Sequence, residues 1–339
     1  MTRRGADRSK PGLFATLASG LSALIAWGAV LVVLAWVVVR LIGDRVELLQ
    51  TPSWVPVHFV LAGAFLAAFS ASLLIVGVRR ARRRPPIGLT LLWLGVLGLG
   101  TFVALVEHRV QGLVRTPGEG GIELLFWNQA GSLISPEEVE SLIGRSDPAI
   151  ITDFRTRGGP RSVARRSVRA GTFTIFTERE LVESRTQTLG FRATRFGMDP
   201  SPAAIDPGWF VRVVLGPSPD DPEPIELWLI DLPSDTGLHR MEVLARAAEI
   251  ASGVPEPDFI VGDFNTPRGS ASLRRLVGER REASASGGPY LLRGTWPRQA
   301  SLWHIDMLFP SDRWRSTDYR FVDPGTGAHR AIRARLERR

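Results

Sequence analysis

Three long apolar stretches near the N-terminus limit what this chain can fold into more than any other feature. They run from Leu13 to about Val39, from Val57 to Val78 and from Ile87 to Val106, and none contains a charged side chain. About 20 apolar residues in a helix cross the roughly 30 Å hydrocarbon core of a bilayer. A core helix of a soluble protein would carry polar residues on its outer face, and a signal peptide has a shorter apolar run. The sequence therefore predicts three transmembrane helices.

Basic residues beside these stretches predict an orientation. They gather before the first stretch and between the second and the third: Arg3, Arg4, Arg8, Lys10, Arg79, Arg80, Arg82, Arg83 and Arg84. In the loop between the first two stretches, Arg40 and Arg45 are opposed by Asp44 and Glu47. Basic loops stay in the cytoplasm, so residues 1–12 are predicted to face inward. The chain is therefore predicted to be a multi-pass protein of the cell (inner) membrane. Three crossings place the residues after Val106 outside the cytoplasm.

Composition separates this three-helix anchor, residues 13–106, from a second domain. Nearly all acidic residues follow Ser135, and a polar, glycine-containing linker over 107–121 leads to residues 122–339, a length that can bury its own core. The chain has no cysteine, which excludes disulfides and thiolate metal sites. The positive charge behind the net charge of +8 comes almost entirely from arginine. We interpret this excess as compositional bias rather than as a nucleic-acid footprint.

Short apolar runs alternate with helical patterns after residue 121, which indicates a layered α/β or α+β domain. Ser135, Pro136 and Glu138 form a capping-box pattern that predicts the start of a helix. The predicted strands are 122–127, 149–153, 172–176, 210–215, 225–231, 259–262, 305–309 and 319–322, and two further helices are predicted over 238–251 and 270–278.

The segment Gly-Asp-Phe-Asn-Thr-Pro at 262–267 follows directly on an apolar strand. Asp263 and Asn265, two residues apart at the carboxyl end of that strand, can point side by side into one cleft. A carboxylate there can accept the proton of an attacking water, and an amide can donate to a phosphoryl oxygen. Because Gly, Asp, Asn and Pro also favour turns, the segment taken alone is equally compatible with a plain turn.

Four segments in the same order make the domain resemble the endonuclease/exonuclease/phosphatase superfamily, the deoxyribonuclease I-like proteins, over residues 121–333. They are LLFWN at 124–128, IVGDFNTP at 260–267, HIDMLF at 304–309 and AHRAI at 328–332. The resemblance implies an α/β fold, a two-sheet β-sandwich flanked by helices. It also implies a Mg²⁺ (or Mn²⁺) held near Asn128, a reacting centre at Asp263 and Asn265, and a catalytic His329 oriented by Asp306.

Three positions depart from the family pattern. Arg155 stands where the family has its chief metal-ligand glutamate, and Asp153, two residues earlier on the same strand face, is the candidate substitute ligand. Asp231 stands where a histidine is expected, and it can accept a hydrogen bond or bind metal. Ala328 replaces the acidic residue before His329. A catalytically degenerate binding module of the same fold therefore stays open beside a hydrolase.

An arginine-rich stretch after the second predicted strand bears on the substrate. It is either a solvated loop or a clamp for phosphate groups, which guanidinium binds bidentately, and an anchored domain has anionic lipid headgroups within reach. Its members are Arg155, Arg157, Arg161, Arg165, Arg166 and Arg169. The predicted function is a membrane-anchored, metal-dependent phosphoester hydrolase whose partners are the bilayer and a lipid headgroup, a nucleic acid such as extracellular DNA, or a small phosphoester.

Overall fold

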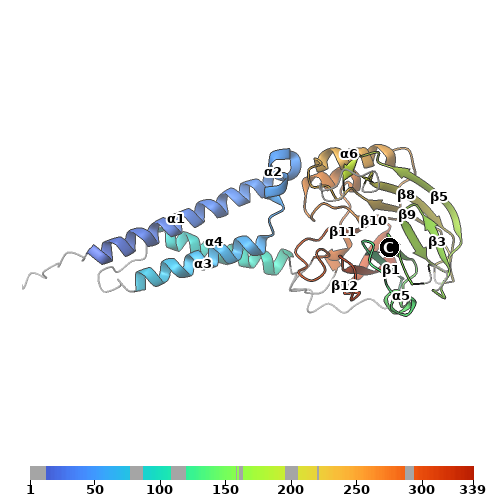
Figure 1. The fold of residues 1–339 in the computed structure, drawn as a ribbon, viewed down its shortest axis with the longest axis horizontal. Helices are drawn as coiled ribbons and strands as arrows, with labels where there is room; N and C mark the ends of the chain where they lie inside the picture. Colours follow the sequence, from blue (N-terminus) through green and yellow to red (C-terminus); the bar gives the residue numbers. More distant parts are fainter. Residues whose placement is uncertain are drawn as a thin grey trace, which may run out of the picture. The chain divides into compact units, whose positions relative to one another are not determined.

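A computed structural model describes residues 13–76, 87–107, 120–157, 159, 163–194, 205–219, 221–286 and 294–339. The predicted cytoplasmic N-terminus, the basic loop that carries Arg79–Arg84, Arg161 and most of the linker lie outside the described residues. The chain forms two compact units (Figure 1). One comprises residues 1–41 and 55–106, and the other comprises residues 42–54 and 107–339.

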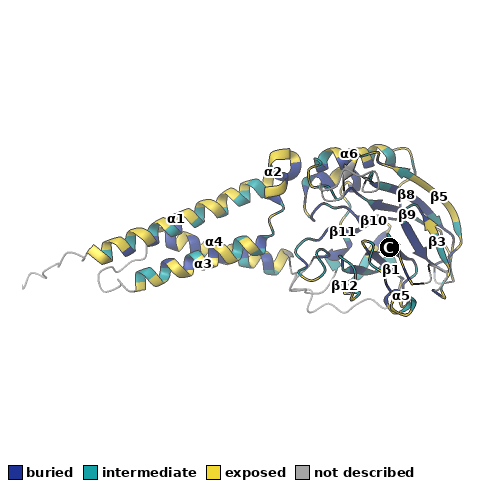
Figure 2. Ribbon diagram, in the orientation of Figure 1, coloured by how far each residue is buried: buried dark blue, intermediate teal, exposed yellow. Residues whose placement is uncertain are grey.

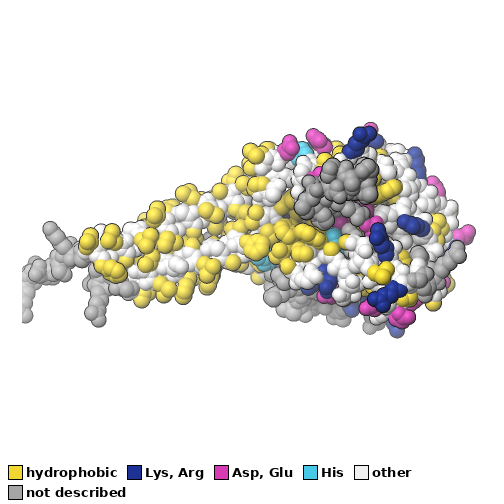
Figure 3. All heavy atoms as spheres, viewed as in Figure 1, with side chains coloured by type: hydrophobic (Ala, Val, Ile, Leu, Met, Phe, Trp, Pro, Cys, Tyr) yellow, Lys and Arg dark blue, Asp and Glu magenta, His cyan; other side chains and the backbone are white. Residues whose placement is uncertain are grey.

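The first unit is built from α1 (Leu13–Ile42), α3 (Val57–Val76) and α4 (Ile87–Phe102), which continues into a π-helical turn over Val103–Glu107. Each of the three helices is long and apolar enough to cross a membrane. Small residues lie where they pack together, and the Ser22 hydroxyl donates to the Ala71 carbonyl at 2.9 Å. Large apolar side chains cover the outside of this unit (Figures 2 and 3). Small residues inside and large apolar residues outside are typical of helices packed within lipid.

The second unit is a sandwich of two mixed sheets, which confirms the predicted fold class. The first sheet contains, in spatial order, β12 (Trp314–Val322), β13 (Ala331–Arg338), β1 (Ile122–Asn128), β2 (Ala149–Thr152), β4 (Phe173–Phe176) and β3 (Ser167–Ala170). The second contains β11 (Asp306–Pro310), β10 (Phe259–Asp263), β9 (Ile225–Asp231), β8 (Trp209–Leu215) and β5 (Leu181–Thr188). A small pair, β6 (Ala193–Thr194) and β7 (Ile205–Asp206), completes the strands of the described residues.

The main core lies between the two sheets, and helices cover their outer faces. In β10, Phe259 and Val261 point into this core while Ile260 points to the opposite face, as the two-residue period of a strand requires. On that opposite face, α6 (Arg240–Ala251), the 3₁₀ turn η7 (Ala271–Leu273) and α7 (Arg274–Val277) cover the second sheet. Helix α5 (Pro136–Ile143) covers the first sheet.

Local signals explain where α5 begins. The Ser135 hydroxyl accepts a hydrogen bond from the Glu138 amide at 3.2 Å, and the Glu138 carboxylate accepts one from the Ser135 amide at 2.9 Å. The predicted capping box is therefore confirmed. The helix predicted over 270–278 is instead the turn η7 followed by the short α7. Strands β3, β5, β6, β7 and β13 were not predicted. Arg169 of the arginine-rich stretch is an exposed residue of β3.

Strand register brings polar residues to one edge of the sandwich. Strand β10 pairs in parallel with β9 and antiparallel with β11, so Asp231, Asp263 and Asp306 lie in one row across the second sheet. In the first sheet, β1 ends at Asn128, and β13 runs antiparallel to β1. The chain just before β13, which contains His329, therefore reaches the same end of β1. These strand ends position the candidate site.

Candidate active site

Only glycine fits at position 262, because β10 lies very close to β9 there. A Cβ atom at this position would lie 1.8 Å from the Ile230 carbonyl oxygen. Directly after it, the Asp263 carboxylate accepts a hydrogen bond from the backbone amide of Asn265 at 2.8 Å, as in an Asx turn. Asn265 adopts a φ of 43°. The segment thus forms the turn that its residue types favour and at the same time presents Asp263 and Asn265 at the strand end.

Asn128 joins the two sheets at the site. Its side-chain amide donates to the Asp263 carboxylate at 2.7 Å, and its side-chain oxygen accepts from the Ala130 amide at 2.9 Å. The neighbouring Gln129 is fully buried, and its side chain bonds to both the amide and the carbonyl of Arg155. The turn after β1 is therefore fixed to the chain after β2, and Asn128 is held facing Asp263.

His329 and Asp306 form a buried pair beside Asp263. The His329 Nδ1 atom lies 2.8 Å from the Asp306 carboxylate, and its Nε2 atom lies 4.0 Å from the Asp263 carboxylate. Trp127 of β1 donates from Nε1 to the His329 carbonyl at 3.2 Å, and the Thr295 hydroxyl accepts from the Asp306 amide at 3.1 Å. Two strand ends and a loop thus hold the imidazole between two carboxylates.

Burial and the neighbouring charges shift the pKa values of Asp263 and His329, the two groups beside Asp306. Burial, followed by the nearby Asp306 carboxylate, raises the pKa of Asp263 to about 7, although His329 and the two amide donors oppose the shift. Burial alone would lower the pKa of His329, but the charge and hydrogen bond of Asp306, with Asp263, raise it to about 9. Both shifts favour the protonated forms, so the site combines a carboxylate that readily takes up a proton with a cationic donor, which suits general acid–base catalysis.

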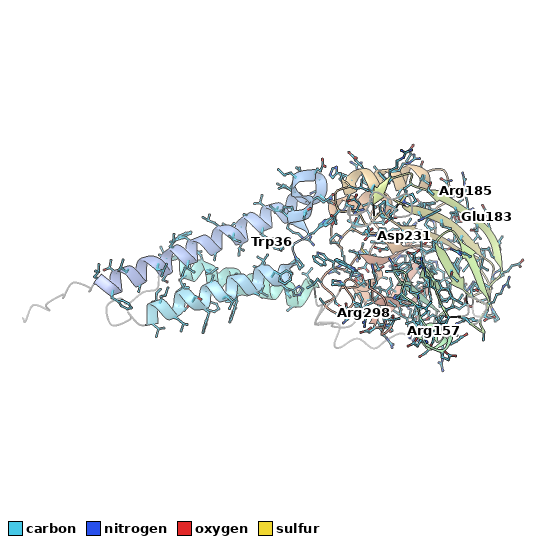
Figure 4. All side chains as sticks on the ribbon, viewed as in Figure 1. Trp36, Arg157, Glu183, Arg185, Asp231 and Arg298 are labelled. Carbon is cyan, nitrogen blue, oxygen red and sulfur yellow. The ribbon has the colours of Figure 1, made fainter. Side chains whose placement is uncertain are left out.

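Asn265 and Asp231 lie next to this trio. The Asn265 side-chain amide donates to the Leu232 carbonyl at 2.7 Å, which fixes the direction of the side chain. Asp231, which is labelled in Figure 4, is aligned with Asp263 in the parallel pair of β9 and β10. Both side chains therefore lie on the same face of the sheet. Asp231 is partly exposed, whereas Asp263 is buried.

Asp153 and Arg155 have different surroundings. The Asp153 carboxylate accepts a hydrogen bond from the Thr172 hydroxyl at 2.9 Å, and it does not belong to the group formed by Asp263, Asp306 and His329. The Arg155 side chain is exposed. The residue of β2 aligned with Asn128 is Thr152, whose buried hydroxyl has no hydrogen-bond partner within the part of the chain that the structure describes.

The carboxylates of Asp263 and Asp306, with the side-chain oxygen of Asn128 nearby, fit a hard divalent cation. One ligand atom from each of Asp263, Asp306 and His329 lies within 4.8 Å of the others. The second carboxylate oxygen of Asp306 is buried and has no hydrogen-bond partner among the described residues. Carboxylate and amide oxygens are the ligands that Mg²⁺ prefers, and Mg²⁺ completes its shell with water and substrate phosphate.

Several supporting residues escaped prediction from the sequence: Trp127, Gln129, Thr152, Thr295 and Arg240. Arg240 is fully buried, and its guanidinium donates to the carbonyls of Pro233 and Asp235, both at 2.7 Å. Burial lowers its pKa to about 10, while nearby carboxylates that include Asp263 oppose the shift. The nearly continuous apolar run of β1 explains Trp127 as a core residue, but no sequence signal identifies the others.

Comparison with known proteins finds a family model that matches part of the sequence and solved structures with a similar fold. The model of the Endonuclease/Exonuclease/phosphatase family matches residues 193–328, which include Asp231, Asp263 and Asp306. No curated protein matches the sequence. The structure is similar to that of the mannosyl-6-phosphatase of Bacteroides thetaiotaomicron, with 13% identity, a TM-score of 0.50 and coverage of 64% of this chain and 99% of that one.

Two further solved structures have comparable similarity. An endonuclease/exonuclease/phosphatase family protein of Bacteroides thetaiotaomicron is 11% identical, with a TM-score of 0.48 and coverage of 65% and 98%. A conserved protein of unknown function from Enterococcus faecalis is 13% identical, with a TM-score of 0.48 and coverage of 64% and 100%. Sequence identities this low concern the fold and not the activity.

Proposed function

We propose that the protein is a membrane-anchored, divalent-metal-dependent phosphoester hydrolase. The premise is that its C-terminal domain belongs to the endonuclease/exonuclease/phosphatase family. The observation that carries the proposal is the convergence of Asn128, Asp263, Asp306 and His329, which come from four separate strand ends. Titratable groups with perturbed pKa values gather at functional sites, and the pKa values of both Asp263 and His329 are raised here.

Each residue has a role that its contacts support. Asp263, placed at the end of β10 beside His329, accepts the proton of the attacking water. His329, oriented by Asp306 and protonated at neutral pH, donates from Nε2 to a phosphoryl oxygen. Asn265, whose side chain is fixed on the Leu232 carbonyl, stands beside the reacting phosphorus and stabilises the negative charge that develops there.

Asn128 and Asp263 would hold a Mg²⁺ or Mn²⁺ ion, together with a third oxygen ligand. Asp231 is better placed for this role than Asp153, because it lies in register with Asp263 while Asp153 bonds to Thr172 on the far side of β2. When bound, such an ion neutralises charge on the phosphoryl oxygens.

The membrane anchor and its orientation belong to the same proposal. The three apolar helices support insertion into a bilayer, and the basic residues before the first and between the second and third support a cytoplasmic N-terminus. The hydrolase domain, residues 122–339, then acts outside the cytoplasm, on a lipid headgroup, a nucleic acid or a small phosphoester.

A substrate screen with the full-length protein in detergent tests the proposal. Phosphomonoesters and phosphodiesters are offered with Mg²⁺, with Mn²⁺ and with EDTA. We expect metal-dependent turnover that falls by about 10²–10⁴-fold in Asp263→Asn, the usual contribution of a general base, and that persists in Asp323→Asn, which changes a surface carboxylate that is 50% exposed. Equal turnover in wild type and Asp263→Asn would refute the role of Asp263.

A catalytically degenerate binding module is the second candidate, because Arg155 stands where the family has its metal-ligand glutamate. The two candidates differ in metal binding. Calorimetric titration of the wild-type protein with Mg²⁺ and Mn²⁺ yields binding heat that Asp263→Asn abolishes if the hydrolase proposal holds. No binding heat, together with no turnover of any ester in the screen, would favour the binding module.

A further inference from the structure

The segment Ile42–Trp54, which joins the first two apolar helices along the chain, packs as part of the second unit. It consists of a 3₁₀ turn η1 (Gly43–Arg45) and the short helix α2 (Glu47–Ser53). Its buried side chains are polar: Asp44 is fully buried and Gln50 is 3% exposed. Leu48, by contrast, is 83% exposed. A segment that buries its polar residues is held by hydrogen bonds rather than by apolar contacts, so its partners show what it does.

Asp44 caps the turn that follows the Asp263–Asn265 segment. Its carboxylate accepts hydrogen bonds from the amides of Ala271 and Ser272 at 2.8 and 3.2 Å, and also from the Ser272 hydroxyl. The residue in the ordinary N-cap position, Ser270, makes no capping bond with its side chain. Asp44 therefore supplies the acceptor that the first free amides of a helical segment need.

Gln50 does the same for the helix that follows β9. Its side-chain oxygen accepts from the Arg240 amide at 2.7 Å, the first amide of α6, whose own N-cap residue His239 gives no side-chain cap. Its amide nitrogen donates to the carbonyls of Thr236 and Leu238 at 3.2 and 3.0 Å. One side chain thus fixes both the start of α6 and the loop before it. Figure 1 shows α2 beside α6 within this unit.

Both capped elements adjoin the candidate site. The loop held by Gln50 begins at Leu232, whose carbonyl accepts the Asn265 side chain, and Arg240 binds the carbonyls of Pro233 and Asp235 in the same loop. The turn held by Asp44 ends the loop that starts at Asn265. Asn265 is therefore bounded on both sides by backbone that the segment between two apolar helices holds in place.

We propose that Ile42–Trp54 is a positioning segment of the active site, in which Asp44 and Gln50 hold the loops after β9 and β10 and so set the place of Asn265. Neither residue contacts the reacting groups. The effect on catalysis rests on the function proposed above, whereas the effect on the two loops does not. It follows that a fragment starting after residue 107 lacks an element of its own site.

Hydrogen–deuterium exchange of the full-length protein in detergent tests the support itself. In Asp44→Ala we expect exchange to rise roughly 2- to 30-fold over 264–280, and in Gln50→Ala over 232–245, the factors that correspond to the loss of a helix cap. Peptides from β1 and β2 serve as the internal reference and should not change. Glu47→Gln and Thr51→Ala, exposed positions of the same segment, are the matched controls.

Steady-state kinetics on the most active ester of the screen test the catalytic consequence. We expect kcat to fall about tenfold or more in both alanine variants with little change in KM, since Asn265 acts at the reacting phosphorus. Asp44→Asn, which keeps an oxygen acceptor for the Ala271 amide, should recover most of kcat.

Three outcomes overturn the proposal. Unchanged exchange in both loops means that the segment does not hold them, and an equal rise over β1 and β2 means that it supports the whole domain. Wild-type kcat in a variant with raised exchange means that it positions nothing catalytic. If the wild type turns over no ester, the proposed function fails while the exchange measurement still decides whether the segment holds the loops.

Discussion

Asp263 and Asp306 place two buried carboxylates around one imidazole, and this arrangement determines how the site ionises. Asp306 is fully buried, so its charge acts strongly on both neighbours. It hinders ionisation of Asp263 and favours protonation of His329. The neutral donors Asn128 and Asn265 reduce the cost of the Asp263 charge without removing it. The metal-free site is thus poised between two protonation states, and a divalent cation would favour the ionised one.

A pH dependence of stability follows for the metal-free protein. The folded-state pKa of Asp263, about 7, lies above the ordinary value of 3.8, and that of His329, about 9, lies above 6.5. In both cases the folded state binds the proton more tightly than the unfolded state does, so the stabilisation is complete below the ordinary pKa and disappears as pH rises through the folded-state pKa. The Tm in EDTA should therefore fall between about pH 4 and 7 and again between about pH 6.5 and 9.

Two variants separate these contributions. Asp263→Asn should lose the decline towards pH 7, and His329→Gln should lose the decline towards pH 9, because each removes the group that titrates. Thermal melts in EDTA at pH 5, 7 and 9 measure both. Melting curves of wild type and variants that shift in parallel across this range would contradict the assignment.

The sequence identified the catalytic candidates because they lie in short motifs at the ends of apolar strands. The proximity of Asn128, Asp263, Asp306 and His329 agrees with that expectation, and their roles remain predictions. Gln129, Thr295, Arg240 and Asp44 were not identified. Each is an ordinary polar residue whose function comes from a hydrogen bond to chain that is distant in sequence, such as the bond between Asp44 and Ser272.

At the scale of elements, β5 and β13 were missed for a related physical reason, the exposure of their polar side chains. In β5 most side chains are exposed, so charged and polar residues replace the apolar run that identifies a buried strand. It lies at the edge of its sheet, where such a composition also discourages association with another sheet. In β13 arginines alternate with buried Ile332, Ala334 and Leu336. The central strands β1, β9 and β10 were predicted because both of their faces are buried, one against the other sheet and one beneath helices.

Gly262 tests how tightly β9 and β10 must approach. Gly262→Ala would place a methyl group on the Ile230 carbonyl, at 1.8 Å before relaxation, and the neighbouring atom is backbone that cannot rotate away. We expect a loss of about 1–3 kcal/mol of unfolding free energy, as for other overpacked sites, together with lower activity because Asp263 follows directly.

Urea denaturation of Gly262→Ala measures this loss, and Gly253→Ala is the matched control. A Cβ atom at Gly253 would lie 3.6 Å from the nearest atom, the Ile250 carbonyl oxygen, which is an ordinary contact. The two variants add the same methyl group, one against backbone at 1.8 Å and the other at an ordinary contact distance. A Gly262→Ala protein as stable as Gly253→Ala would mean that the two strands can separate at little cost.

At the scale of the whole molecule, the similarity to known proteins has the extent of the C-terminal domain. The Bacteroides phosphatase is covered over 99% of its length by 64% of this chain. Residues 122–339 number 218 of 339, which is also about 64%. The aligned share therefore matches the size of the domain alone, and the helices add a feature whose use must be argued from this chain. In the proposed anchored hydrolase, the orientation of these helices in the membrane decides which compartment supplies the substrate.

The absence of cysteine makes that orientation directly measurable. Single cysteines at Ser9, before the first apolar helix, and at Glu256, whose side chain is 93% exposed on the second unit, can each be labelled with a membrane-impermeant maleimide. Because basic loops remain cytoplasmic, Glu256→Cys should react in intact cells, and Ser9→Cys should react only after permeabilisation. The unmodified chain offers no thiol and serves as the blank. The reverse labelling pattern would place the site in the cytoplasm, where its phosphoester would have to be a cytoplasmic one.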